Sequence, residues 1–141
     1  MTFTLDTSTE FGSRVAGHLE RDAVVWLTTV DPRVTPQPVP VWFLWTGAEF
    51  LVFSQPDKPK LRNIARNERV ALNFRGTAGG GDIVIFTGIA AVESGQPTDA
   101  EQSAHNAKYA ADMRRIGMTA EEFAREYSVP IRVTPEKLRG F

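Results

Sequence analysis

The amino-acid sequence predicts an α+β fold whose main part is an antiparallel β-sheet or barrel. Six segments rich in β-branched and aromatic residues support this prediction, because several of them are consecutive and joined by short turns. Helical segments lie only before, between and after these runs, whereas a doubly wound parallel sheet alternates strands with helices throughout. The 141 residues, 42% of them hydrophobic, suffice for one core, and no repeat or linker divides them. We therefore expect a single domain over residues 1–141.

The first predicted element is a helix over about 8–21. Its start has the spacing of a capping box, and apolar residues then recur four apart on one face. These residues are Thr7, Glu10, Phe11, Val15 and Leu19. Three strands are predicted next, over 23–30, 35–45 and 49–54. The turns between them are Asp31-Pro32-Arg33 and Thr46-Gly47-Ala48. Because the loop between the last two strands is short, we expect them to pair as an antiparallel hairpin.

A short helix over 58–67 comes next, with Asp57 as its predicted N-cap and Pro59 in its first turn. Two strands, two helices and one strand complete the chain; their predicted ranges are 69–74, 82–94, 98–116, 119–127 and 129–138. Two capping boxes and a glycine define the later helices; these residues are Thr98, Glu101, Thr119, Glu122 and Gly117.

Several classes of chemistry are excluded by composition and spacing. The chain has no cysteine, so disulfides, thiolate metal sites and cysteine nucleophiles are absent. His18 and His105 lack metal-ligand spacing, no serine lies in a nucleophile elbow, and the glycines at 79–81 match no nucleotide-binding motif. The N-terminus has no signal-peptide pattern, and no stretch approaches the roughly 18 apolar residues of a membrane span. The expectation is a soluble cytoplasmic protein without a metal site or a membrane partner.

The net charge of −1 is unevenly distributed along the chain. Residues 57–75 contain six basic and two acidic residues, a net +4, which leaves −5 for the rest. A strand end with the hydroxyl of Ser54 directly precedes this segment, and a helix with Lys60 and Asn63 starts within it. Free amides at a helix start, a hydroxyl and a lysine are typical of a phosphate site, and this interpretation is favoured over a solvated basic helix face.

A second pattern is the alternation of Pro36, Pro38 and Pro40 before Val41-Trp42-Phe43. Prolines two apart in a strand remove every second amide from the ladder. Two interpretations are open: an edge strand that avoids further pairing, or an edge left free to meet a flat ligand.

Three segments carry a resemblance to a known family: PQPVPVWFLW, FLVFSQPDKPKLRNIARNERVAL and IRVTPEKLRGF. The chain resembles the pyridoxamine 5′-phosphate oxidase-like split β-barrel family of flavin and deazaflavin proteins. More closely, it resembles the actinobacterial branch of F420-dependent oxidoreductases. The likeness covers about 20–94 and 129–141, whereas 95–128 has no recognisable family pattern.

The resemblance implies a homodimer of six-stranded split barrels (the FMN-binding split barrel), with peripheral helices and two cofactor sites at the dimer interface. It implies that Lys60 holds the cofactor phosphate. The strand beside the ring is implied to comprise Gln37, Pro38, Val39, Pro40, Val41 and Trp42, and the phosphate side Phe53, Ser54, Gln55, Lys58, Lys60 and Asn63. The chain lacks the oxidase's further arginine-containing phosphate motif and its C-terminal substrate signature. Coenzyme F420 is therefore the expected cofactor, with FMN as the alternative.

The resulting hypothesis is an F420-dependent oxidoreductase that transfers a hydride to a small, planar, hydrophobic electrophile. No catalytic side chain is assigned, because the reactive atom belongs to the cofactor. The second hypothesis is a non-catalytic carrier or sensor that binds F420 or FMN in the same groove. A nucleic-acid-binding barrel that uses the basic segment and Trp26, Trp42 and Trp45 is a third hypothesis, which the overall charge of −1 disfavours.

Overall fold

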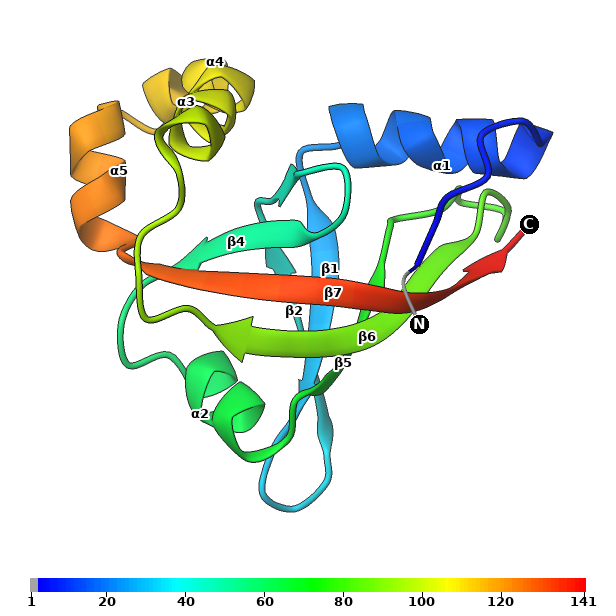
Figure 1. Cartoon of the computed structure of the whole chain (residues 1–141), viewed down its shortest axis with the longest axis horizontal. Helices are drawn as coiled ribbons and strands as arrows, with labels where there is room; N and C mark the ends of the chain where they lie inside the picture. The colour runs from blue at the N-terminus through cyan, green and yellow to red at the C-terminus, as the bar shows by residue number, and fades with distance from the viewer. Residues whose placement is uncertain (1–2) are drawn as a thin grey trace.

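The computed structural model describes residues 3–141, which form a curled, antiparallel sheet of seven strands with helices at its margins (Figure 1). The strands are β1 (Val25–Val30), β2 (Pro36–Val41), β3 (Leu44–Trp45), β4 (Phe50–Ser54), β5 (Arg69–Asn73), β6 (Val84–Val92) and β7 (Val129–Gly140). Their order across the sheet is β2-β1-β5-β6-β7-β4-β3, and each neighbouring pair is antiparallel. The predicted α+β class is confirmed.

The number of strands differs from the predicted six, because the segment 35–45 is two strands. The backbone leaves the ladder at Phe43, whose amide donates to the Tyr109 hydroxyl at 2.8 Å. The Phe43 carbonyl accepts from Lys108 Nζ at 2.9 Å. Side chains of the segment 95–128 thus satisfy backbone groups that a continuous strand would have paired. The predicted hairpin is consequently formed by the short β3 with β4, at the pair Trp45 and Phe50.

The helices are α1 (Glu10–Arg21), α2 (Pro59–Arg66), α3 (Asp99–Lys108), α4 (Ala110–Arg115) and α5 (Ala120–Glu126). The capping boxes at the starts of α3 and α5 are confirmed. The predicted range 98–116 is two helices, which meet at Tyr109.

Two predicted helix starts are wrong. Thr9, not Thr7, caps α1, because the Asp6 carboxylate accepts from the Ser8 amide at 3.0 Å and holds a turn there. Lys58, not Asp57, is the N-cap of α2, and no side chain caps this helix. Asp57 has a left-handed backbone (φ 63°), which turns the chain before α2 begins.

The concave side of the sheet holds the main core. Val15 and Leu19 of α1 pack there against Leu27, Phe50 and Phe86 of the strands. Ile64 of α2 joins the same core. Helices α1 and α2 lie at opposite ends of the curled sheet (Figure 1), so they close it from two sides.

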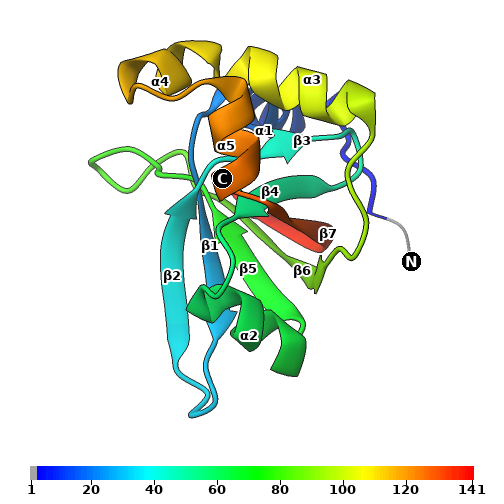
Figure 2. The ribbon, with the colours of Figure 1, turned by 90° about the vertical axis from the view of Figure 1, so that its left-hand side faces the viewer.

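A second, smaller core connects α3, α4 and α5 to the outer side of β4. Its buried members are Tyr109, Met113 and Phe123, and Trp42 and Phe53 pack against them. The three helices lie together beyond one end of the sheet, away from α2 (Figure 2). None of the helices within residues 3–141 is long and apolar enough to cross a membrane.

Strand β2 lies at one edge of the sheet and pairs only with β1. In an antiparallel pair, every second residue of a strand bonds to the partner strand through both its N–H and its C=O. Proline has no N–H, so the residues of β2 that donate to β1 are Gln37, Val39 and Val41. The amide positions on the open side of β2 are those of Pro36, Pro38 and Pro40, which cannot donate. The structure therefore places the prolines on an edge strand, as both interpretations require.

The prolines also belong to the outer face of the sheet. Trp26 is paired with Pro40 and is 39% exposed. Alternate residues of a strand share a side. The registers place Pro36, Pro38, Pro40, Trp26, Thr28, Val30, Ala71, Asn73, Ile85, Thr87, Ile89, Arg69, Lys137 and Arg139 on this face. All of them are exposed or half-buried. We call this set the outer sheet face.

Candidate functional site

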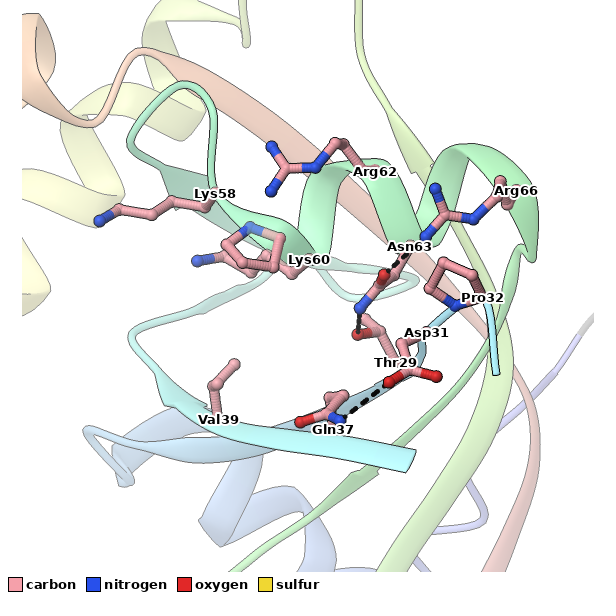
Figure 3. Close-up of a pocket in the computed structure, with 11 residues that line it drawn as sticks. Thr29, Asp31, Pro32, Gln37, Val39, Lys58, Lys60, Arg62, Asn63 and Arg66 are labelled. Carbon is pink, nitrogen blue, oxygen red and sulfur yellow. Dashed lines mark hydrogen bonds between the residues drawn. The ribbon is translucent and has the colours of Figure 1, made fainter. Parts of the chain in front are cut away.

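A cavity of about 530 Å³ lies between α2 and the β1–β2 hairpin (Figure 3). The hairpin supplies one wall and the start of α2 the other. The lining residues are Thr29, Asp31, Pro32, Gln37, Val39, Lys58, Pro59, Lys60, Arg62, Asn63 and Arg66. We call this the basic cavity.

Four of the lining side chains are cationic, and they come from α2 or its N-cap. Within residues 3–141, none of the four lies within ion-pair distance of a carboxylate. Arg62 donates to the Asp57 carbonyl at 3.1 Å, and Arg66 donates to Asn63 Oδ1 at 3.1 Å. Lys58 and Lys60 extend toward the same end of the cavity (Figure 3). The cavity therefore has a net positive charge that its own side chains do not neutralise.

Asp31 is the one acidic residue in this lining, and its carboxylate is already engaged. It accepts from the amides of Thr35 and Arg33, each at 2.9 Å, and from Gln37 Nε2 at 3.1 Å. These hydrogen bonds, that of Thr35 first, lower the pKa of Asp31. The carboxylate thus fixes the hairpin turn and orients Gln37.

Lys60 differs from the other three cations because it is half-buried. Burial lowers the pKa of its ammonium group, and the neighbouring Lys58 lowers it further. A desolvated cation without a carboxylate partner is stabilised by any anion that enters the cavity. The geometry therefore fits a phosphate or a similar oxyanion at Lys60.

Asn63 is buried and links α2 to β1. Its Nδ2 donates to Thr29 Oγ1 at 3.0 Å, and its Oδ1 accepts from Arg66. Both of these hydrogen bonds lie within the protein, so the Asn63 amide connects α2 to β1. It holds α2 in place over the cavity.

A second cavity, of about 210 Å³, meets the first at Lys60, which lines both. Its other lining residues are Pro40, Val41, Trp42, Phe53, Ile116, Phe123 and Tyr127. We call it the aromatic cavity. A basic and an aromatic compartment side by side suit a ligand with an anionic part and a flat apolar part.

The structure brings most of the predicted site residues to these two cavities. Gln37, Val39, Lys58, Lys60 and Asn63 line the basic cavity, and Pro40, Val41, Trp42 and Phe53 line the aromatic one. Three predicted residues line neither: Pro38, Ser54 and Gln55.

Two of these three departures have a physical reason. Pro38 lies on the outer sheet face. Ser54 is buried, and its hydroxyl donates to the Gln55 carbonyl at 2.8 Å, so it is not available to a phosphate in this arrangement.

Sequence reasoning did not identify Ile116, Phe123 and Tyr127 as lining residues. They lie in the segment 95–128, which has helix-capping signals but no pattern of the family. The four-residue spacing of Phe123 and Tyr127 indicates one helix face but not which strand that face meets.

Both histidines are surrounded by other side chains of the protein. His105 is fully buried between Phe53 and Phe123, and burial, with a smaller effect of Lys108, lowers its pKa to about 4. His18 lies between the carboxylates of Asp22 and Asp82, at 2.7 and 2.8 Å. In the described part of the chain, no three His, Asp or Glu side chains are placed to hold a metal ion.

Comparisons with known proteins agree with this architecture. A family model described as "Pyridoxamine 5′-phosphate oxidase" matches residues 11–141. No curated protein matches the chain significantly. A solved F420 reductase is 28% identical, with a TM-score of 0.66 over 87% of this chain and 94% of that one.

Two more distant structures share the fold. A protein from Listeria innocua described as a pyridoxamine 5′-phosphate oxidase is 20% identical, with a TM-score of 0.65 over 90% of this chain and 94% of that one. The heme storage protein HutZ from Vibrio cholerae is 14% identical, with a TM-score of 0.66 over 94% of this chain and 95% of that one.

Proposed function

Because the chain belongs to the pyridoxamine 5′-phosphate oxidase family, we propose that it is a cytoplasmic F420-dependent oxidoreductase that exchanges a hydride between F420 and a small organic acceptor. The observation that carries the proposal is the junction of the two cavities at the half-buried Lys60. The 28% identity to an F420 reductase supports F420 over FMN.

The basic cavity suits the anionic part of this cofactor. F420 has a phosphodiester and an oligoglutamate tail, so it is a longer anion than FMN. Lys58 and Lys60 are placed for the phosphodiester, and Arg62 and Arg66 continue the positive charge along α2 toward the tail. Each charge-assisted hydrogen bond to phosphate contributes on the order of 1.5–3 kcal/mol.

The inner side of β2 suits the flat ring. Val39 and Val41 present apolar side chains between the basic and the aromatic cavity, and Gln37 is held in place by Asp31. Reduced F420 supplies the hydride when it is bound. The chain itself binds and orients the ring and excludes water with Trp42 and Phe53.

We also propose that two copies associate through the outer sheet face. The β1 and β2 positions of this face are uncharged, and they include the 39%-exposed Trp26. Burying it against a second copy removes apolar surface from water.

Parallel fluorescence titrations with F420 and FMN test the cofactor assignment. We expect saturable binding of F420 at a lower Kd than that of FMN. Tighter binding of FMN, or no binding of F420, would contradict the proposal.

A mixing experiment separates the enzyme from a carrier. Reduced F420 is incubated with the protein and a panel of aromatic and conjugated acceptors. Oxidation above the protein-free rate by at least one acceptor is expected. Tight binding with no oxidation by any acceptor would instead identify a cofactor-binding carrier.

A further inference from the structure

The aromatic cavity has stacked and therefore flat walls. The Trp42 indole lies parallel to the Tyr109 ring, with centres 4.4 Å apart and an angle of 4°. The Phe123 and Tyr127 rings are likewise stacked, with centres 4.5 Å apart and an angle of 13°. Tyr109 and Phe123 are buried, so both stacks are anchored in the second core. Walls of this kind accept a planar ring rather than a flexible chain.

The polar groups of the same cavity are few. Among the lining side chains, only Lys60, Tyr127 and the indole N–H of Trp42 are polar, and no lining residue is acidic. The Tyr127 hydroxyl has no hydrogen-bond partner in the described residues, whereas that of Tyr109 contacts backbone groups of Ala23 and Phe43. Lys60 is shared with the basic cavity, where an anion would engage it. The Trp42 N–H points along the plane of the indole, so a ring that stacks on the indole face does not meet it. Tyr127 is therefore the neutral donor for a ligand that stacks in the aromatic cavity.

The size and the opening of the cavity further limit which compounds can bind there. Its volume of about 210 Å³ is below the roughly 300–1,000 Å³ of sites for drug-sized ligands. Ile116, 47% exposed, lies in its lining and provides an apolar entrance. A small fused-ring compound matches these limits better than a larger molecule.

We infer that the aromatic cavity is a second ligand subsite, for a small planar aromatic compound whose carbonyl oxygen accepts a hydrogen bond from Tyr127. A ring that carries an alkylammonium group is disfavoured there, because the ammonium group would find no carboxylate and would lie close to the Lys60 cation. That this ligand is the hydride acceptor rests on the proposed function, but its binding does not.

The test is a titration of the cofactor-free protein, followed by quenching of tryptophan fluorescence. The probes are 2-acetylnaphthalene, 2-ethylnaphthalene, which has nearly the same shape without the carbonyl, and 2-naphthylmethylammonium. We expect the ketone to bind about three- to tenfold more tightly than the hydrocarbon, as one hydrogen bond predicts. The ammonium compound is expected to bind most weakly.

Two variants locate the interaction. Tyr127→Phe removes only the hydroxyl, and it is expected to abolish the preference for the ketone while the affinity for 2-ethylnaphthalene stays the same. Trp42→Phe is expected to remove most of the quenching, because Trp26 and Trp45 do not line this cavity. Equal affinities of the two neutral probes for the native protein would overturn the inference.

The inference would also be overturned by a ketone preference that persists in Tyr127→Phe, or by quenching unchanged in Trp42→Phe. These titrations contain no F420. A protein that binds the ketone but not F420 would therefore disprove the proposed function and leave the subsite standing, and the reverse result would do the opposite.

Discussion

Two half-buried cations in this protein have contrasting surroundings. Arg132 on β7 contacts three carboxylates: Glu101 at 2.6 Å, Glu93 at 3.1 Å and Glu49 at 3.8 Å. Lys60 has no such partner in the part of the chain that the structure describes. A cation that the fold surrounds with carboxylates stabilises the structure, whereas one left desolvated and unpaired suits a ligand.

Replacing Lys60 by alanine is expected to weaken F420 binding at least tenfold, because one charge-assisted bond to phosphate is lost. The measurement is the Kd from fluorescence titration. The matched control is Lys137→Ala, which removes an exposed lysine of β7 away from both cavities. An unchanged Kd for Lys60→Ala would refute the phosphate assignment.

At the scale of single residues, the sequence predicted some site positions and not others. Lys60 was predictable because strand end, helix start and local charge coincide there. The role of Asn63 was not decidable, since an amide can bind a ligand or tie two elements, and only its 3.0 Å bond to Thr29 distinguishes them. Tyr127 was not predictable, because its position depends on how α5 packs against Trp42 and Phe53.

At the scale of elements, the interruption between β2 and β3 connects the helical segment to the sheet. The Tyr109 hydroxyl accepts from the Phe43 amide at 2.8 Å and lies 2.7 Å from the Ala23 carbonyl. Burial raises the pKa of this hydroxyl, so it stays protonated. No pattern in the segment 35–45 reveals this break, because the residue responsible is Tyr109.

Tyr109→Phe is expected to lower the free energy of unfolding by about 1–3 kcal/mol, because it leaves the buried Phe43 amide without an acceptor. Urea denaturation measures the loss. Tyr127→Phe is the matched control: its hydroxyl has no partner within residues 3–141, so a change within about 0.5 kcal/mol is expected. Equal effects of the two substitutions would show that the Tyr109 bonds do not stabilise the break.

The Arg132–Glu101 pair connects α3 to β7 and makes stability depend on pH. Hydrogen bonds from Arg132 are the largest cause that lowers the pKa of Glu101, to about 2 from 4.5. Since the pKa is lower in the folded state, the stabilisation is complete above about pH 4.5 and is lost as pH falls toward 2. After solvent screening, its size is on the order of 1–2 kcal/mol.

Urea midpoints measured between pH 5.5 and pH 3 check this expectation. The decline should be smaller in Glu101→Gln, which retains a side chain that can complete the capping box with Thr98. Glu121→Gln on α5, an exposed position, should decline as the native protein does. A native-like decline in Glu101→Gln would exclude this pair as the source.

At the scale of the whole molecule, the fold class and the succession of strands along the chain were predictable from the sequence. Both depend on hydrophobic patterns and turn residues within short segments. The order of strands across the sheet was not, since β7 inserts between β6 and β4 from the far end of the chain. The placement of α3 to α5 likewise depends on long-range packing around Trp42 and Phe53.

The proposed dimer predicts a mass of two chains in sedimentation equilibrium. Trp26→Lys is expected to shift the protein toward monomer, because it places a charge in the centre of an apolar interface. Val92→Lys is the control, since Val92 is 41% exposed but does not belong to the outer sheet face. A native protein that sediments as a monomer would disprove the dimer.

The open side of β2 also limits how the molecule can aggregate. A growing cross-β fibre needs both donors and acceptors along the strand it recruits, and Pro36, Pro38 and Pro40 leave this one without donors. The opposite edge of the sheet is β3, only two residues long. Neither border of the sheet is a good template for another chain, so the protein can expose an apolar face to self-association without inviting uncontrolled strand addition.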